Sequence, residues 1–166
     1  MIFLGADHGG YHLKEKLKKW LKEWELVYED LGNTDFDKDD DYPRYAFAVA
    51  ESVANEEKKG KEYPYPWNKR PKGILICRSA IGMVIAANKI KGAKAGAAYN
   101  ERMAKLSREH NDANILALSE DLVDEILIIR ILKTWLDTEF SGEDRHKRRI
   151  RQIGEYEVKI QNSNDK

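Results

Sequence analysis

The chain of 166 residues contains a single cysteine, Cys77, and has no long apolar run. One cysteine cannot form a disulfide within the chain, so nothing indicates an oxidising compartment. The apolar stretch in MIFLGADHGG is short and follows no basic segment, so it is unlike a signal peptide. No apolar run approaches the ~20 residues that a membrane helix needs. We therefore expect a soluble, cytoplasmic protein that contacts no membrane.

The chain also lacks an excess of charge of one sign. It has 29 basic residues (Lys and Arg) and 29 acidic ones, and this balance argues against a nucleic-acid partner. Basic residues cluster only in RHKRRIR (145–151), a pattern that is most often a solvated helix face. The acids, histidines and Cys77 show no metal-ligand spacing, so we expect no metal and no other cofactor.

Short apolar segments alternate with segments of helical periodicity along the chain. The pattern predicts strands at 2–6, 25–32, 73–77, 93–99 and 113–119, and helices at 11–24, 44–57, 79–90, 101–110, 120–137 and 145–160. Such alternation is typical of parallel strands joined by right-handed crossover helices. The expected fold is α/β: a Rossmann-like three-layer sandwich with a central parallel sheet of about five strands, in a single domain over 1–160.

Two segments do not fit this alternation. Residues 56–72 hold three of the four prolines and are too polar for a core, so we expect an exposed insertion there. Its aromatic residues could form a contact surface, or the segment could simply be solvated. The polar residues 161–166 (QNSNDK) are expected to be a disordered tail.

The ends of the expected strands carry the residues that could do chemistry. In open parallel sheets, ligands bind at the carboxyl ends of the strands. Cys77 stands at such an end, directly before a helix whose dipole would lower the pKa of the thiol. Arg78 would act in the same direction if its side chain turned inward. The alternative is that Cys77 is a small buried hydrophobic residue.

The turn after Cys77 could bind an anion. Backbone N–H groups around Ile81 and Gly82 lie at a helix start, where they have no helical partner, and Ser79 adds a hydroxyl. A base beside such a turn suits proton abstraction next to a carbonyl, because fixed donors stabilise the enolate oxygen. The segment lacks the spaced glycines and the Lys-Ser/Thr pair of a Walker A loop.

Three other positions allow both a functional and a structural interpretation. His110 lies at the end of a helix before a strand. It could face the ligand-binding edge of the sheet, or it could be a surface helix cap or a packing residue. After the first strand, Asp7 could cap the following helix while His8 faces the pocket. Arg145 and Arg149 are four residues apart on one helix face and could hold a phosphate, or could be solvated.

Taken together, these segments resemble the type B ribose-5-phosphate isomerase family, which also includes galactose-6-phosphate isomerase subunits. The matching segments occur in family order: GADHGGYHLKEKLKKWL, DYPRYA (41–46), GILICRSAIGMVIAANKIKGAKA (73–95), SREHNDANILAL (107–118) and RHKRR (145–149). The resemblance implies metal-free interconversion of an aldose phosphate and a ketose phosphate through an enediolate. Ribose 5-phosphate and ribulose 5-phosphate would be the first pair to consider.

The resemblance also implies roles for individual residues. Cys77 would be the catalytic base that moves the proton between C1 and C2, and Ser79 would assist it. The backbone of 79–82, including Ile81 and Gly82, would hold the enediolate oxygen. His110 would open the sugar ring.

The remaining roles concern substrate binding and assembly. Asp7 and Tyr42 would contact the sugar ring, and Asn111 one of its hydroxyl groups. The phosphate would be bound by His8, Arg145 and Arg149. Members of this family form homodimers or homotetramers whose active sites contain residues from two subunits.

The sequence departs from the family pattern in three segments. The usual Cys-Gly-Thr/Ser-Gly-x-Gly turn has Arg78 and Ala80 in place of glycines, so we expect backbone angles there that tolerate a Cβ. The usual Gly-x-Arg is replaced by residues 119–121, and Asp121 is expected to repel a phosphate. One extra residue before Arg145 could shift its register.

These departures favour an isomerase with altered substrate preference. One alternative is an isomerase of a different sugar or sugar phosphate. The other is a non-catalytic sugar-phosphate-binding partner subunit, although such a protein has no need for the intact Cys77 and His110.

Overall fold

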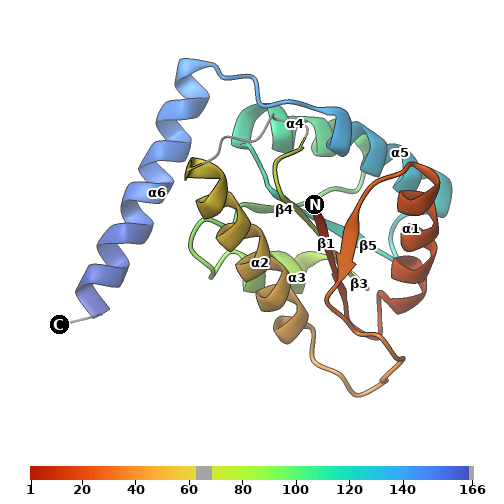
Figure 1. The fold of residues 1–166 in the computed structure, drawn as a ribbon. Coiled ribbons are helices and arrows are strands. Elements are labelled where there is room, and N and C mark those ends of the chain that lie inside the picture. Colours follow the sequence, from red (N-terminus) through yellow and green to blue (C-terminus); the bar gives the residue numbers. More distant parts are fainter. Residues whose placement is uncertain (63–68, 165–166) are drawn as a thin grey trace.

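The computed structural model describes residues 1–62 and 69–164 as one parallel sheet flanked by helices (Figure 1). The strands are β1 (Ile2–Ala6), β2 (Tyr28–Asp30), β3 (Lys72–Cys77), β4 (Ala95–Ala97) and β5 (Ile115–Ser119). The helices are α1 (Tyr11–Glu23), α2 (Tyr42–Glu62), α3 (Ile81–Ala87), α4 (Glu101–Asn111), α5 (Glu125–Asp137) and α6 (Asp144–Asn164). None of the helices in the described residues is long and apolar enough to cross a membrane.

The strand order is β2-β1-β3-β5-β4, and all four neighbouring pairs are parallel. This confirms the expected Rossmann-like α/β sandwich with five strands. The chain runs outward from β1 to β2 and then returns to the other side of β1 as β3. The strand order therefore reverses between β1 and β3, and in open α/β sheets the crevice above such a point is where ligands bind.

Apolar side chains on both faces of the sheet build the two halves of the core. On one face, α1, α4 and α5 pack on alternate residues of the central strands, such as Ile74 and Leu116. On the other face, α2 and α3 pack on the intervening residues, such as Leu75 and Ala117. Because side chains alternate along a strand, Cys77 belongs to the α2–α3 face. Helix α6 extends away from the sheet in Figure 1.

Several element ends differ from the sequence-based expectation. The helix expected over 120–137 begins only at Glu125, where the carboxylate of Asp124 caps it by accepting the N–H of Leu127 at 3.0 Å. The helix expected over 79–90 is only Ile81–Ala87. Local periodicity indicated these helices, but the turns that precede them are fixed by contacts with distant residues.

The polar segment 56–72 is not wholly an exposed loop. Helix α2 continues through Glu62, and at the other end Pro71 and Lys72 are buried where β3 begins. Residues 63–68 lie outside the described residues. The expected disordered tail also differs, since α6 runs through Asn164 and only 165–166 lie outside the description. The first seven residues of the 56–72 segment, EEKKGKE, are mostly Glu and Lys, which favour helix, and the count of prolines concealed this.

Candidate active site

Two neighbouring strands end side by side at the crevice where the strand order reverses. Ala6 of β1 pairs with Ile76 of β3, so Asp7 and Cys77 leave the sheet next to each other. On the other side, Cys77 pairs with Ser119 at the end of β5. The expectation that these strand ends share one edge is therefore correct.

The thiol of Cys77 is buried, with 6% of the residue exposed. Its Sγ accepts the backbone N–H of Ala80 at 3.1 Å. Burial raises the pKa of the Cys77 thiol, and the nearby carboxylate of Asp7 adds to the rise. The N–H groups of Ser79 and Ala80 lower the pKa but do not outweigh burial. The expectation of a thiol pKa lowered by the helix start was therefore wrong.

Arg78 does not turn toward the thiol. Its side chain is 65% exposed, and its Nη1 lies 3.3 Å from Oδ2 of Asp121. Arg78 and Asp121, two residues that depart from the family pattern, are therefore ion-paired, so Arg78 offsets part of the negative charge of Asp121. The stem of Arg78 lies over the β1–α1 loop, where a Cβ added to Gly9 would come within 2.6 Å of the Arg78 Cγ.

The turn between β3 and α3 is held by two hydroxyl groups from other elements. Ser119 Oγ donates to the carbonyl of Arg78, and the hydroxyl of Tyr99 donates to the carbonyl of Ser79 at 2.7 Å. Ala80 has φ 67°, in the left-handed region, contrary to the expectation that the turn suits a residue with a Cβ. Sequence reasoning missed Tyr99, because it follows a strand 20 residues away and its contact is purely tertiary.

The β1–α1 loop places Asp7 in the crevice. Asp7 is 7% exposed, and its Oδ1 is buried with no hydrogen-bond partner among the described residues. Burial raises the pKa of its carboxyl group. Asp7 does not cap α1: the N-cap is Gly10, whose N–H bonds to the Asp7 carbonyl at 3.0 Å, with no side-chain cap. The Asp7 carboxylate is thus left available to a ligand.

His8 is held by Asp40, a residue that the sequence did not single out. Both the Nδ1 and the backbone N–H of His8 lie 2.8 Å from Asp40 Oδ1, and the hydrogen bond to Asp40 raises the pKa of His8. Asp40 is buried, and its Oδ2 accepts the amide N–H of Asn33 at 2.7 Å. Residues 33–43 hold four other aspartates, and no spacing in the sequence distinguishes Asp40 from them.

Tyr42 reaches the same crevice from the first residue of α2. A Cβ added to Gly82 would lie 2.8 Å from Tyr42 Cζ, so the ring lies directly against the start of α3. Tyr42, Ile81 and Gly82 therefore lie together, close to Ser79. The resemblance assigned these residues to one site, and they do lie together, while their roles stay predictions.

The other expected site residues lie elsewhere in the chain. Helix α4 runs opposite to the strands, so His110 and Asn111 at its end lie at the amino edge of the sheet. That edge is separated from Cys77 by the length of β3, roughly 17 Å for its six residues. The expectation that His110 faces the same edge within one chain was wrong, because a helix that ends before a parallel strand ends at the amino edge.

The basic end of α6 lies beside His110. The rings of His110 and His146 are 4.3 Å apart, and His146 Nδ1 lies 2.9 Å from Ser141 Oγ. Arg145 and Arg149 are exposed on this helix, and Arg145 Nε contacts Glu143 at 2.7 Å. Within one chain, neither arginine meets the Cys77 crevice.

Among the described residues, no group of three or more His, Cys, Asp and Glu side chains could hold a metal ion. The groups near the end of β3 are the thiol of Cys77, the carboxyl groups of Asp7 and Asp40, the imidazole of His8, and the backbone N–H groups of the turn before α3. These groups can abstract and return a proton and can bind an oxyanion.

Comparison with known proteins shows the family of the chain. The Ribose/Galactose Isomerase family model matches residues 2–153. Ribose-5-phosphate isomerase B of Escherichia coli is 36% identical over 152 residues, covering 92% of this chain and 93% of that protein.

Two solved structures share the fold over almost their whole length. Ribose-5-phosphate isomerase B of Mycoplasma genitalium, solved with bound ribulose-5-phosphate, has a TM-score of 0.85, 38% identity and 95% coverage of both chains. The Clostridium thermocellum ribose-5-phosphate isomerase B has a TM-score of 0.83 and 42% identity, covering 96% of this chain and 98% of that one. The chain therefore belongs to the ribose/galactose isomerase family of aldose–ketose isomerases.

Proposed function

We propose that this protein interconverts ribose 5-phosphate and ribulose 5-phosphate, with Cys77 as the catalytic base. The observation that supports this most directly is the buried thiol of Cys77 beside the start of α3 and the unpartnered oxygen of Asp7. The names of the relatives supply the substrate. A thiol with a raised pKa is also a stronger base once ionised, which suits removal of a proton from carbon.

In the proposed reaction, the Cys77 thiolate takes the proton from C2 of the open-chain aldose. The electron pair left on carbon moves to the carbonyl and gives an enediolate, whose oxygen is bound by the N–H groups of 79–82. Ser79 moves the hydroxyl proton between the two oxygens. The Cys77 thiol then returns its proton to C1, which yields the ketose and restores the thiolate.

The substrate is proposed to be held at both ends. Asp7 and Tyr42 contact the sugar, and Asn111 binds one of its hydroxyl groups. Asp40 raises the pKa of His8, which favours the protonated imidazole that attracts the phosphate at one side. Arg145 and Arg149 complete the phosphate site, and His110 opens the ring.

We propose that a second copy of the chain supplies four of these residues: His110, Asn111, Arg145 and Arg149. They lie at the opposite sheet edge from Cys77, so a single chain does not assemble the whole site. Helix α6 carries apolar side chains that are exposed in one chain: Ile153, Tyr156, Val158 and Ile160. Ile81 and Ile85 of α3 are more than half exposed as well. We therefore propose a homodimer, or a homotetramer built from such dimers, in the cytoplasm.

The test is an isomerase assay of the pure protein on ribose 5-phosphate, in parallel with allose 6-phosphate, galactose 6-phosphate and free ribose. Wild-type protein is expected to convert ribose 5-phosphate, and Cys77→Ser to lower kcat by orders of magnitude, because a hydroxyl is a far poorer base near neutral pH. Turnover of another sugar alone would reassign the substrate. Turnover that persists unchanged in Cys77→Ser would remove the thiol from the mechanism.

A further inference from the structure

A cavity lies at the opposite edge of the sheet from Cys77. Its volume is about 770 Å³, and its walls come from the starts of β1 and β3, the end of α1 with the following loop, and the end of α5. The lining combines apolar side chains, among them Trp24, Leu26, Val27 and Leu136, with the cationic side chains of Lys69, Arg70, Lys72 and Lys133. Of the described residues, two acidic ones line it, Glu25 and Asp137.

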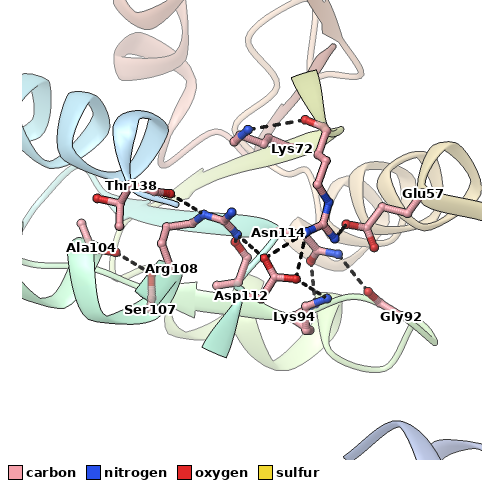
Figure 2. Close-up of polar contacts among 12 residues, drawn as sticks. Glu57, Lys72, Gly92, Lys94, Ala104, Ser107, Arg108, Asp112, Asn114 and Thr138 are labelled. Carbon is pink, nitrogen blue, oxygen red and sulfur yellow. Dashed lines mark hydrogen bonds and ion pairs between the residues drawn. The ribbon is translucent and has the colours of Figure 1, made fainter. Parts of the chain in front are cut away.

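Lys72 is a buried cation without a carboxylate partner. The residue is only 4% exposed, and no carboxylate oxygen of the described residues lies within 4 Å of its ammonium group. Among the described residues, its ammonium group makes one hydrogen bond, a long one of 3.5 Å to the carbonyl of Arg70 (Figure 2). Burying an ammonium group with so few hydrogen bonds and no ion pair destabilises the folded protein. An anion bound in the cavity would provide the negatively charged partner.

The neighbouring acids are already shared by other cations. Asp112 contacts Arg108 at 3.0 Å, Arg70 at 3.2 Å and Lys94 at 3.6 Å, as Figure 2 shows for the labelled residues. Glu57 contacts Arg70 at 3.1 Å. The polar cluster around Lys72 therefore has more positive than negative groups. Burial, Arg108 and Arg70 together lower the pKa of Lys72 to about 8.

The apolar wall decides what kind of anion fits. The Trp24 ring lies beside the cavity, with Lys133 Nζ 4.9 Å from the ring centroid. We propose that this cavity binds a small organic anion, whose phosphate or carboxylate group meets Lys72 and whose apolar body lies against Trp24. This site is separate from the Cys77 crevice, and nothing in the isomerase chemistry requires it.

Titration with 1-anilinonaphthalene-8-sulfonate, an aromatic anion, followed by its fluorescence, tests the proposal. Lys72→Met is expected to raise the Kd about tenfold or more, because a charged hydrogen bond is lost while the cavity becomes more apolar. Lys133→Met, at the exposed rim, should raise the Kd as well, and it is informative even if Lys72→Met fails to fold. Lys16→Met is the matched control, because Lys16 is exposed and paired with Glu125.

Inorganic phosphate is then added at constant ionic strength. It should displace the dye from wild type and from Lys16→Met, with a weaker effect on Lys72→Met. Binding of the dye by Lys72→Met as tight as by wild type would show that only apolar contact is involved and would overturn the proposal. Failure of phosphate to displace the dye from wild type would overturn it equally.

Discussion

Cys77 shows how one residue can be found by sequence while its electrostatics cannot. Its place at a strand end before a helix was visible, and so was the possibility of a base. The sign of its pKa shift depends on burial and on Asp7, which reaches it from another strand. Asp7 lies 70 residues before Cys77 in the chain, so no local sequence pattern predicts the sign of this pKa shift.

The pH dependence of the reaction follows from this shift. A base must be deprotonated to act, and burial raises the pKa of Cys77 above its ordinary range. We therefore expect kcat/KM for ribose 5-phosphate to rise with pH across the alkaline range, through that raised pKa, rather than levelling off near neutrality. A profile that is flat from pH 6 to pH 9 would contradict the assignment.

Asp40 provides the second prediction at this scale. Asp40→Asn removes the negative charge that raises the pKa of His8, so that pKa should fall. We expect KM for the sugar phosphate to rise by about tenfold, since one charged hydrogen bond to the phosphate is weakened, with a smaller change in kcat. The exposed Asp39→Asn is the matched control and should change neither constant. An unaltered KM in Asp40→Asn would exclude the His8–Asp40 pair from phosphate binding.

Among the elements, the turn between β3 and α3 contributes most to the site. Its sequence was recognisable, but its conformation is fixed by Tyr99 and Ser119, which belong to later segments. Similarly, the strands were predictable because five apolar segments alternate with helical ones. The ends of α2, α5 and α6 were not, because caps and tertiary contacts decide where a helix begins and ends.

Tyr99→Phe tests the role of the turn. The substitution keeps the ring and removes only the hydrogen bond to the Ser79 carbonyl, so the free energy of unfolding should fall by about 1 kcal/mol. We also expect kcat to fall severalfold, because the N–H groups that we propose to bind the enediolate would be displaced. Tyr28→Phe, on the distant strand β2, is the control. Equal kcat values for Tyr99→Phe and wild type would show that the turn does not depend on this bond.

At the scale of the whole molecule, the chain has two chemically different edges. The carboxyl edge carries Cys77, Asp7 and His8, while the amino edge carries Lys72, His110 and the basic start of α6. The sequence indicated nearly all of these residues, and the family resemblance indicated that two subunits share a site. It could not show that one edge also holds a buried, poorly compensated cation, because Lys72 is an ordinary polar residue in a charged segment.

Lys72 should make the stability of the protein depend on pH. Its pKa is about 8 in the folded protein and near 10.5 when unfolded, so the folded state disfavours the proton. Below pH 8 the charged Lys72 lowers the free energy of unfolding by the full amount, about 3 kcal/mol. This destabilisation is lost as the pH rises from 8 toward 10.5. Lys72→Met should therefore increase the free energy of unfolding at pH 7, and its advantage should shrink above pH 8. Denaturant unfolding at fixed protein concentration measures both, and a less stable Lys72→Met at pH 7 would contradict this account.

The central claim is that Cys77 of one chain and His110 of another act on the same substrate. Cys77→Ser and His110→Gln, carrying different tags, are each assayed alone and then after unfolding and refolding together, with isolation of the mixed dimer to confirm exchange. Each variant alone should be nearly inactive on ribose 5-phosphate. In a one-to-one mixture, half of the dimers are mixed and each has one intact site, so about a quarter of wild-type activity should return. A mixed dimer as inactive as its parents would contradict the shared site.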